Sequence, residues 1–202
     1  MNELGEDMPF LSGTVFVMVL LLTSPWPAAE QTGGAANRSP EVFSGTAATK
    51  NAHGAVSGTL VVTLRRVTPE FDRKVVETAL KEGGYPRFLQ AIRNAPQVGN
   101  VVLAGGKPHA IRYARERMDS GYRILVLVTD RPIYFVGGAQ PGATPRQGFE
   151  VSVIELRIDP EGAGGGSLAA AARVRPDGDG GVLLDDYAEE LITLSGITRK
   201  AS

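Results

Sequence analysis

The chain has 202 residues but no cysteine and only two histidines, His53 and His109. The lack of cysteine excludes disulfides, thiolate metal centres and cysteine nucleophiles. The two histidines are far apart and neither lies in an H-E-x-x-H pattern, so a zinc site is not expected. The chain carries 21 basic and 22 acidic residues, a balance that argues against nucleic acid as a partner. We expect neither a metal nor a cofactor.

Residues 1–29 contain a hydrophobic run, Phe10–Leu22, and predict a signal peptide or an N-terminal anchor. Pro25 ends the run, which is too short for a transmembrane helix of roughly 20 apolar residues. Small residues up to Ala29 offer a cleavage site. The start is acidic, which indicates either initiation at Met8 or an uncleaved anchor. We expect export to the periplasm, the cell envelope or the medium, with cleavage favoured and membrane contact only through an uncleaved segment.

Residues 30–53 are small, polar and aperiodic. Such a segment cannot bury enough apolar area to offset the entropy lost on ordering, so we predict a flexible linker. The remaining chain, 54–202, is long enough to bury a proper core, and we expect it to form a single β-rich domain.

Helix signals follow the first predicted strand, Gly58–Val67. Thr68 and Pro69 form a helix start, and Gly83 and Gly84 stop that helix. A second helix is predicted from Pro86 to about Asn94, so that the two form a helical hairpin before the next strand. The first helix has one apolar face, which consists of Phe71, Val75, Val76, Ala79 and Leu80.

Beyond Pro96 the pattern changes to short apolar segments separated by turn residues, which is typical of antiparallel strands. We therefore predict an α+β to mainly β fold, an antiparallel sandwich or open barrel of about seven to nine strands. The apolar alternation changes phase near Val153, which predicts a bulge or a twist there. The predicted strands are Val98–Leu103, His109–Met118, Tyr122–Thr129, Ile133–Val136, Phe149–Ile158, Leu168–Arg175, Val182–Leu184 and Glu190–Thr198.

Several stretches between Gly84 and Arg199 resemble a family of exported bacterial proteins to which no function is assigned. The resemblance covers most of the chain beyond the leader and implies export and a bacterial origin, but it transfers no functional residue. The stretches are YPRFLQAIRNAPQVG, YRILVLVTDRPIYF, EVSVIELRID, AAARVR and LDDYAEELITL.

The length of the turn at Asp119–Gly121 determines which side chains lie opposite one another across the hairpin, and therefore which arginines share a face. A two-residue loop would set Glu116 opposite Arg123 but requires positive φ at two non-glycine residues, which costs more than a surface ion pair returns. A three-residue loop avoids that strain and is favoured. It places Arg115, Arg117 and Arg123 on one face, a candidate site for a carboxylate or phosphate, because each guanidinium offers a fork of donors. Neutralisation of these arginines by acidic residues of the second half is the simpler interpretation.

Three further patterns carry weaker hypotheses. His109 is the histidine that a Ser-His-Asp hydrolase would have to use, yet no G-x-S-x-G pattern surrounds any serine. The segment from Asp177 to Gly181 resembles a calcium loop, but its ligand spacing does not fit an EF-hand, and a hairpin turn explains it. The loop 137–148 is long and rich in glycine and proline, so it is either a flap over the sheet or an ordinary surface loop.

The sequence therefore favours a non-catalytic exported domain that binds an unknown small ligand or an envelope partner. Two alternatives stay open. One is an exported hydrolase that uses His109 with a carboxylate, and the other is a structural envelope protein without a ligand. An enclosed apolar pocket would favour ligand binding, whereas a filled interior would argue for the structural role.

Overall fold

The computed structural model describes residues 39–51, 54–134, 145–178, 180–188 and 191–201, all of which belong to one unit of the chain, Ala35–Ser202. The predicted leader 1–29, His53 and most of the loop 137–148 lie outside the described residues. Within the described ranges, no helix is long and apolar enough to cross a membrane.

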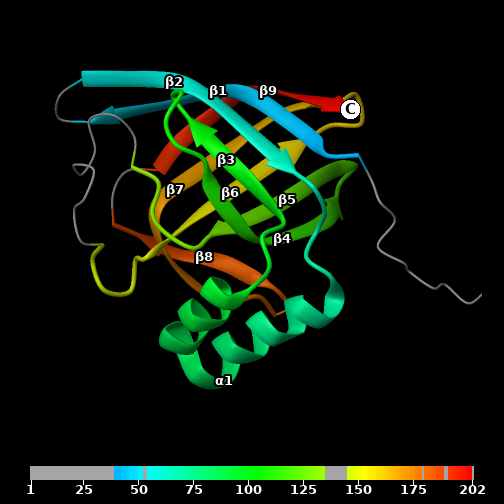
Figure 1. The fold of residues 1–202 in the computed structure, drawn as a ribbon. Coiled ribbons are helices and arrows are strands. Elements are labelled where there is room, and N and C mark those ends of the chain that lie inside the picture. Colours follow the sequence, from blue (N-terminus) through cyan, green and yellow to red (C-terminus); the bar gives the residue numbers. More distant parts are fainter. Residues whose placement is uncertain (1–38, 52–53, 135–144, 179, 189–190, 202) are drawn as a thin grey trace, which may run out of the picture. The chain divides into compact units, whose positions relative to one another are not determined.

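Eight antiparallel strands form a closed barrel, and a ninth strand and one helix are added to it (Figure 1). The order around the barrel is β6-β5-β4-β3-β2-β1-β9-β7, and β6 pairs with β7 to close it. The extra strand, β8, pairs with β7 alone among the described strands. The strands are β1 (Glu41–Asn51), β2 (Gly54–Leu64), β3 (Gly99–Leu103), β4 (His109–Asp119), β5 (Tyr122–Thr129), β6 (Val151–Ile158), β7 (Ala163–Pro176), β8 (Val182–Tyr187) and β9 (Leu191–Ala201).

The predicted β-rich fold is confirmed, and the sheet closes into a barrel instead of a sandwich or an open barrel. Within this barrel β1, the first described strand, pairs with β9, the last, and Glu41 lies opposite Ala201. The pairing of β6 with β7 shifts register between Val151 and Val153, which confirms the bulge predicted near Val153.

The predicted flexible linker is wrong for Glu41–Asn51, which form β1. This strand pairs with β2 along its whole length and with β9 on its other side. Its inward side chains, Phe43 and Ala47, are fully buried. A strand with so few large apolar residues is stable here because both neighbours satisfy its backbone hydrogen bonds.

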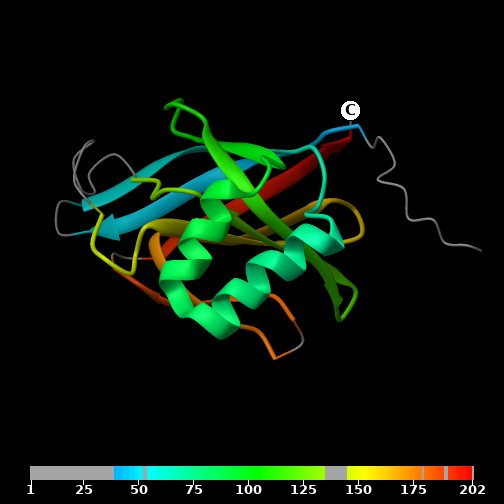
Figure 2. The same cartoon turned by 60° about the horizontal axis from the view of Figure 1, so that its bottom comes forward.

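The predicted helical hairpin is not shown, since one kinked element, α1 (Glu70–Asn94), lies between β2 and β3, but the interruption predicted at Gly83 and Gly84 is confirmed at Gly84. Gly84 interrupts the helical backbone with φ 62° and Pro86 follows it, so the predicted break becomes a bend (Figure 2). Figure 2 brings α1 forward and shows its two halves meeting at an angle beside the barrel.

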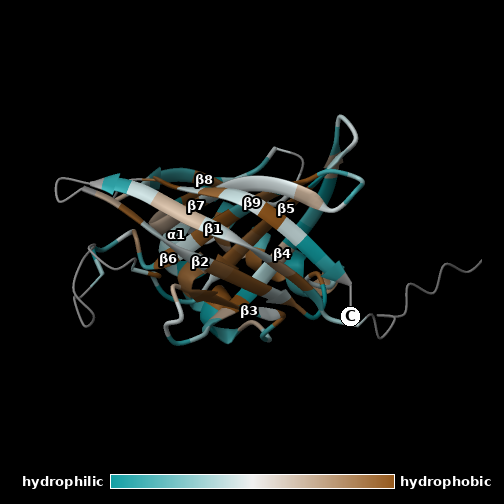
Figure 3. Cartoon of the chain, turned by 90° about the horizontal axis from the view of Figure 1, so that it is seen from above, coloured by the Kyte–Doolittle hydropathy of each residue, from teal (hydrophilic) through white to brown (hydrophobic). Residues whose placement is uncertain are grey.

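Two apolar clusters hold the unit together. One fills the barrel interior with side chains from the strands, among them Phe43, Leu60, Leu127 and Ile154. The other lies outside the barrel, where α1 covers β4 to β8 through Val76, Leu80, Phe88 and Ile92. In Figure 3 the hydrophobic residues concentrate in the middle of the strands, whereas the strand ends are more hydrophilic.

Candidate functional site

The barrel interior is packed with side chains. Leu60, Val101, Leu125 and Leu168 are fully buried there, and they contact one another within the interior cluster. In some small barrels the interior holds a ligand. Because side chains fill the interior of this barrel, a binding site is better sought on its outside.

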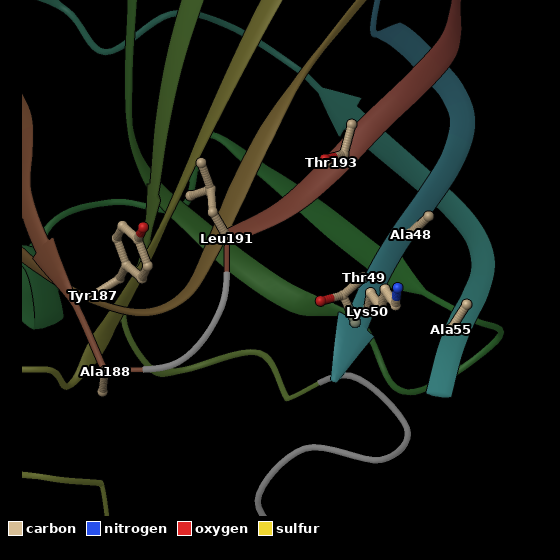
Figure 4. Close-up of a pocket in the computed structure, with 8 residues that line it drawn as sticks. All are labelled: Ala48, Thr49, Lys50, Ala55, Tyr187, Ala188, Leu191 and Thr193. Carbon is tan, nitrogen blue, oxygen red and sulfur yellow. The ribbon is translucent and has the colours of Figure 1, made fainter. Parts of the chain in front are cut away.

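An open cleft of about 770 Å³ lies at one end of the barrel, where β8 and β9 meet the end of the β1–β2 hairpin. Figure 4 shows Tyr187, Ala188 and Leu191 on one side and Thr49, Lys50 and Ala55 on the other. The lining residues are Ala48, Thr49, Lys50, Ala55, Tyr187, Ala188, Leu191 and Thr193.

The strand pairing explains why the surface is hollowed here. Ala172 of β7 pairs with Tyr187 of β8, and Ala169 pairs with Leu191 of β9, so β8 and β9 follow one another along the same side of β7. The next strand, β1, accompanies β9 as far as the pair between Ala48 and Thr193. Beyond that pair β8 extends without β1 beside it, and the cleft opens where the two strands part.

The lining of the cleft is amphipathic. Tyr187 and Leu191 remain 43% and 38% exposed, and both line the cleft. Thr49 and Thr193 add hydroxyl groups, and Lys50 adds an ammonium group at the rim. Concave sites of this kind hold the apolar body of a small molecule and fix its head through a few polar groups.

The favoured three-residue loop of the β4–β5 hairpin is wrong, and the loop has two residues, but it is shifted by one residue from the predicted alternative over Asp119 and Ser120. The observed turn is Ser120–Gly121, with Asp119 opposite Tyr122 and Met118 opposite Arg123. Positive φ falls on Ser120 (50°) and Gly121 (83°), so only one non-glycine residue is strained. A two-residue hairpin loop requires positive φ at both of its residues, and glycine adopts positive φ without strain. The loop over Ser120 and Gly121 is therefore less strained than a loop over Asp119 and Ser120.

The three candidate arginines therefore do not share a face. Side chains alternate along a strand, so Arg115 and Arg117 lie on the face opposite to that of Arg123. Arg115 donates to Asp177 at 2.8 Å, and Arg117 lies 3.7 Å from Asp119. Anion binding by these residues stays a prediction, but the shared face on which it was based is absent.

Arg123 connects the hairpin to the first strand of the barrel. Its two terminal nitrogens donate to the two carboxylate oxygens of Glu41, each at 2.7 Å, and one also donates to Glu116 at 3.0 Å. The hydrogen bonds to Glu41 raise the pKa of the Arg123 guanidinium. Forked pairs of this kind are the stronger class of ion pair, so Arg123 fixes the start of β1.

His109 lies at the start of β4, opposite Val101. Its Nδ1 atom is buried and makes no hydrogen bond within the described part of the chain. The nearby carboxylate of Asp130 accepts instead from Arg112 Nε at 3.1 Å and from Arg131 Nε at 3.2 Å. A histidine oriented by a carboxylate through Nδ1, as hydrolysis would require, is therefore not formed here.

The pKa of His109 is lowered below 6.5, mainly by burial and further by Arg131, whereas Asp130 acts in the opposite direction. The unfolded chain thus binds this proton more readily than the folded one. The contribution of His109 to stability is complete above its unfolded pKa and is lost as pH falls below that value.

We expect the melting temperature to fall between about pH 7.5 and pH 5.0, and to fall less in His109→Gln, which has no proton to bind. Calorimetry of both proteins at the two pH values measures the difference. An equal fall in both proteins would contradict the effect assigned to His109.

The acidic segment near Asp177 does not assemble a cation site within the described residues, where no cluster of three or more metal-ligating side chains occurs. Asp177 accepts from Arg115, and its backbone N–H donates to the carbonyl of Gly181 at 3.0 Å. Asp179 lies outside the described residues. The segment is a hairpin turn between β7 and β8, as the simpler interpretation predicts.

Comparison of this chain with protein-family models, curated proteins and solved structures gives no match. The resemblance to exported bacterial proteins therefore stays a prediction, and the functional argument depends on the geometry alone.

The sequence did not identify the cleft residues, because they come from the ends of β1, β2, β8 and β9. One local signal exists. Tyr187 directly follows Asp185 and Asp186, and Leu191 directly follows Glu189 and Glu190, so each is a large apolar residue next to a pair of carboxylates. Such positions tend to lie near the surface, because the neighbouring charges are rarely buried.

Proposed function

We propose that this protein is an exported, non-catalytic binding protein whose cleft at the ends of β1, β2, β8 and β9 takes a small amphipathic anion. Export is supported by the hydrophobic run Phe10–Leu22. The exposed pair Tyr187 and Leu191 in an open hollow carries the binding proposal.

The lining suggests the chemistry of the ligand. Tyr187 and Leu191 offer an apolar surface to an aliphatic or aromatic body, and Lys50 offers a positive charge at the rim for a carboxylate or phosphate head. Among the described lining residues, the titratable side chains are those of Lys50 and Tyr187. The apolar surface and the single positive charge are the features that suit binding of an amphipathic anion.

Titration with dodecanoate, and with dodecanol as an uncharged probe of equal length, tests the proposal. We expect Tyr187→Ser combined with Leu191→Ser to raise the Kd of both probes by roughly tenfold or more, because apolar contact area is lost. Lys50→Gln is expected to weaken dodecanoate alone. Isothermal titration calorimetry of the full chain measures both effects.

Met118→Ser is the matched control, since Met118 is 66% exposed on the β4–β5 hairpin and does not line the cleft. Its affinity for both probes should equal that of the unaltered protein. Unchanged dodecanoate binding in the Tyr187/Leu191 variant would exclude this cleft. If neither probe nor any co-purified compound binds, the filled barrel interior favours the structural role instead.

A further inference from the structure

The apolar face predicted for the first half of α1 is divided in the structure. Val76 and Leu80 are 1% and 5% exposed and pack against the barrel. Phe71 and Val75 lie on the outer side and are 78% and 50% exposed. The helix therefore presents a second apolar stripe that no described part of the chain covers.

A shallow groove of about 480 Å³ follows this outer stripe. Among them Phe71, Val75, Thr78 and Glu82 follow one another at intervals of four, three and four, as in a seam between two packed helices. Thr78 and Ala79 are small and lie in the middle, where they allow a second helix to approach closely. The groove is lined by Phe71, Lys74, Val75, Thr78, Ala79, Glu82 and Arg87.

We propose that the groove receives the α1 helix of a second copy of this chain, packed antiparallel about a twofold axis near Thr78. In an isologous interface of this kind the same residues face one another from both sides. The proposal does not depend on the cleft, which lies at the ends of β1, β2, β8 and β9.

The charges along the groove are complementary to themselves when the second helix runs in the opposite direction. Lys74 and Glu82 are equally far from Thr78 in sequence, so Lys74 of each copy lies opposite Glu82 of the other. A parallel arrangement would instead place like charges together, which disfavours it.

Lys74 can exchange its partner within one copy for Glu82 of the second copy. Within one copy Lys74 pairs with Glu70 at 2.7 Å, but both side chains are 68% exposed. Such solvent-exposed pairs contribute little to stability and rearrange readily. An opposite charge on a second copy can therefore replace the internal partner of Lys74.

The contact is expected to be weak. The first half of α1, residues 70–83, is about 21 Å long at 1.5 Å per residue. A seam of that length buries less than the roughly 800 Å² per partner of a standard interface, so we expect a Kd on the order of 10–100 µM.

Sedimentation velocity of the full chain from about 5 to about 500 µM, at low salt, tests the proposal. The unaltered protein should shift from monomer to dimer across this range. Phe71→Ser combined with Val75→Ser should stay monomeric, and Met118→Ser, which removes an equally exposed apolar side chain elsewhere, should dimerise normally.

A charge exchange tests the antiparallel register. Lys74→Glu alone and Glu82→Lys alone each bring like charges together and should raise the dimer Kd by roughly tenfold, whereas the double variant should restore it to within about threefold. The folded state of each variant is checked by its melting temperature.

Three outcomes would overturn the proposal. One is a monomer at every concentration, which leaves the stripe to another protein or to a bilayer. The second is association that persists in the Phe71/Val75 variant, which places it elsewhere on the chain. The third is a double charge variant that dimerises no better than the single ones.

Discussion

A chain that begins at Gly54 is expected not to fold. Residues 1–53 include β1, so their removal takes away the neighbour of both β2 and β9 and opens the barrel. It also uncovers the interior that Phe43 fills, and loss of one buried phenylalanine side chain alone costs about 3–5 kcal/mol. Since folded proteins are stable by only about 5–15 kcal/mol, the remainder should not reach a native state.

Circular dichroism and the dispersion of methyl signals in NMR spectra measure this outcome. The matched control is a chain that begins at Ser39 and retains all of β1, including the Glu41 carboxylate that pairs with Arg123. We expect cooperative melting in the control and none in the shorter chain. A cooperative transition in the chain from Gly54 would mean that β2 and β9 can close without β1.

Gly166→Ala should destabilise the folded state by about 3 kcal/mol or more and lower the melting temperature by roughly 10 °C. At Gly166, β7 lies between β6 and β9, and an added Cβ would overlap the backbone carbonyl oxygen of Glu155. Backbone atoms within a closed barrel cannot move aside without breaking hydrogen bonds to their neighbours. Thermal and denaturant unfolding both measure the loss.

Gly178→Ala provides the comparison, because a Cβ at that position meets no atom within 4 Å. Its stability should stay within about 0.5 kcal/mol of the original protein, as for most surface substitutions. If the Gly166 and Gly178 variants have the same melting temperature, the close approach of β6 and β7 does not limit the size of the side chain at position 166.

Most of the strands could be predicted because their apolar residues recur locally. Tyr122–Thr129 coincides with β5, and Leu168–Arg175 falls within β7. The strand β1 could not be predicted in this way, since its inward positions hold one large residue, Phe43, beside glycine and alanine. What stabilises β1 is pairing with β2 and β9, and β9 lies at the far end of the sequence.

The candidate sites were harder to predict than the strands. A register error of one residue at the β4–β5 turn was enough to bring Arg123 together with Arg115 and Arg117, although it lies on the other face. The apolar face of α1 could be identified from its spacing, but the spacing does not say which part of it the barrel covers. Only the folded structure shows that Val76 and Leu80 are buried whereas Phe71 and Val75 are exposed.

The pairing of β1 with β9 has a consequence for the order of events during synthesis. The first strand of the barrel is made early, but its partner β9 is made last, and the two lie side by side in the native sheet. Contacts so distant in sequence form slowly, because a long loop must close before they stabilise the chain. The described barrel therefore cannot close until β9 has left the ribosome, and until then β1 lacks one of its two neighbours.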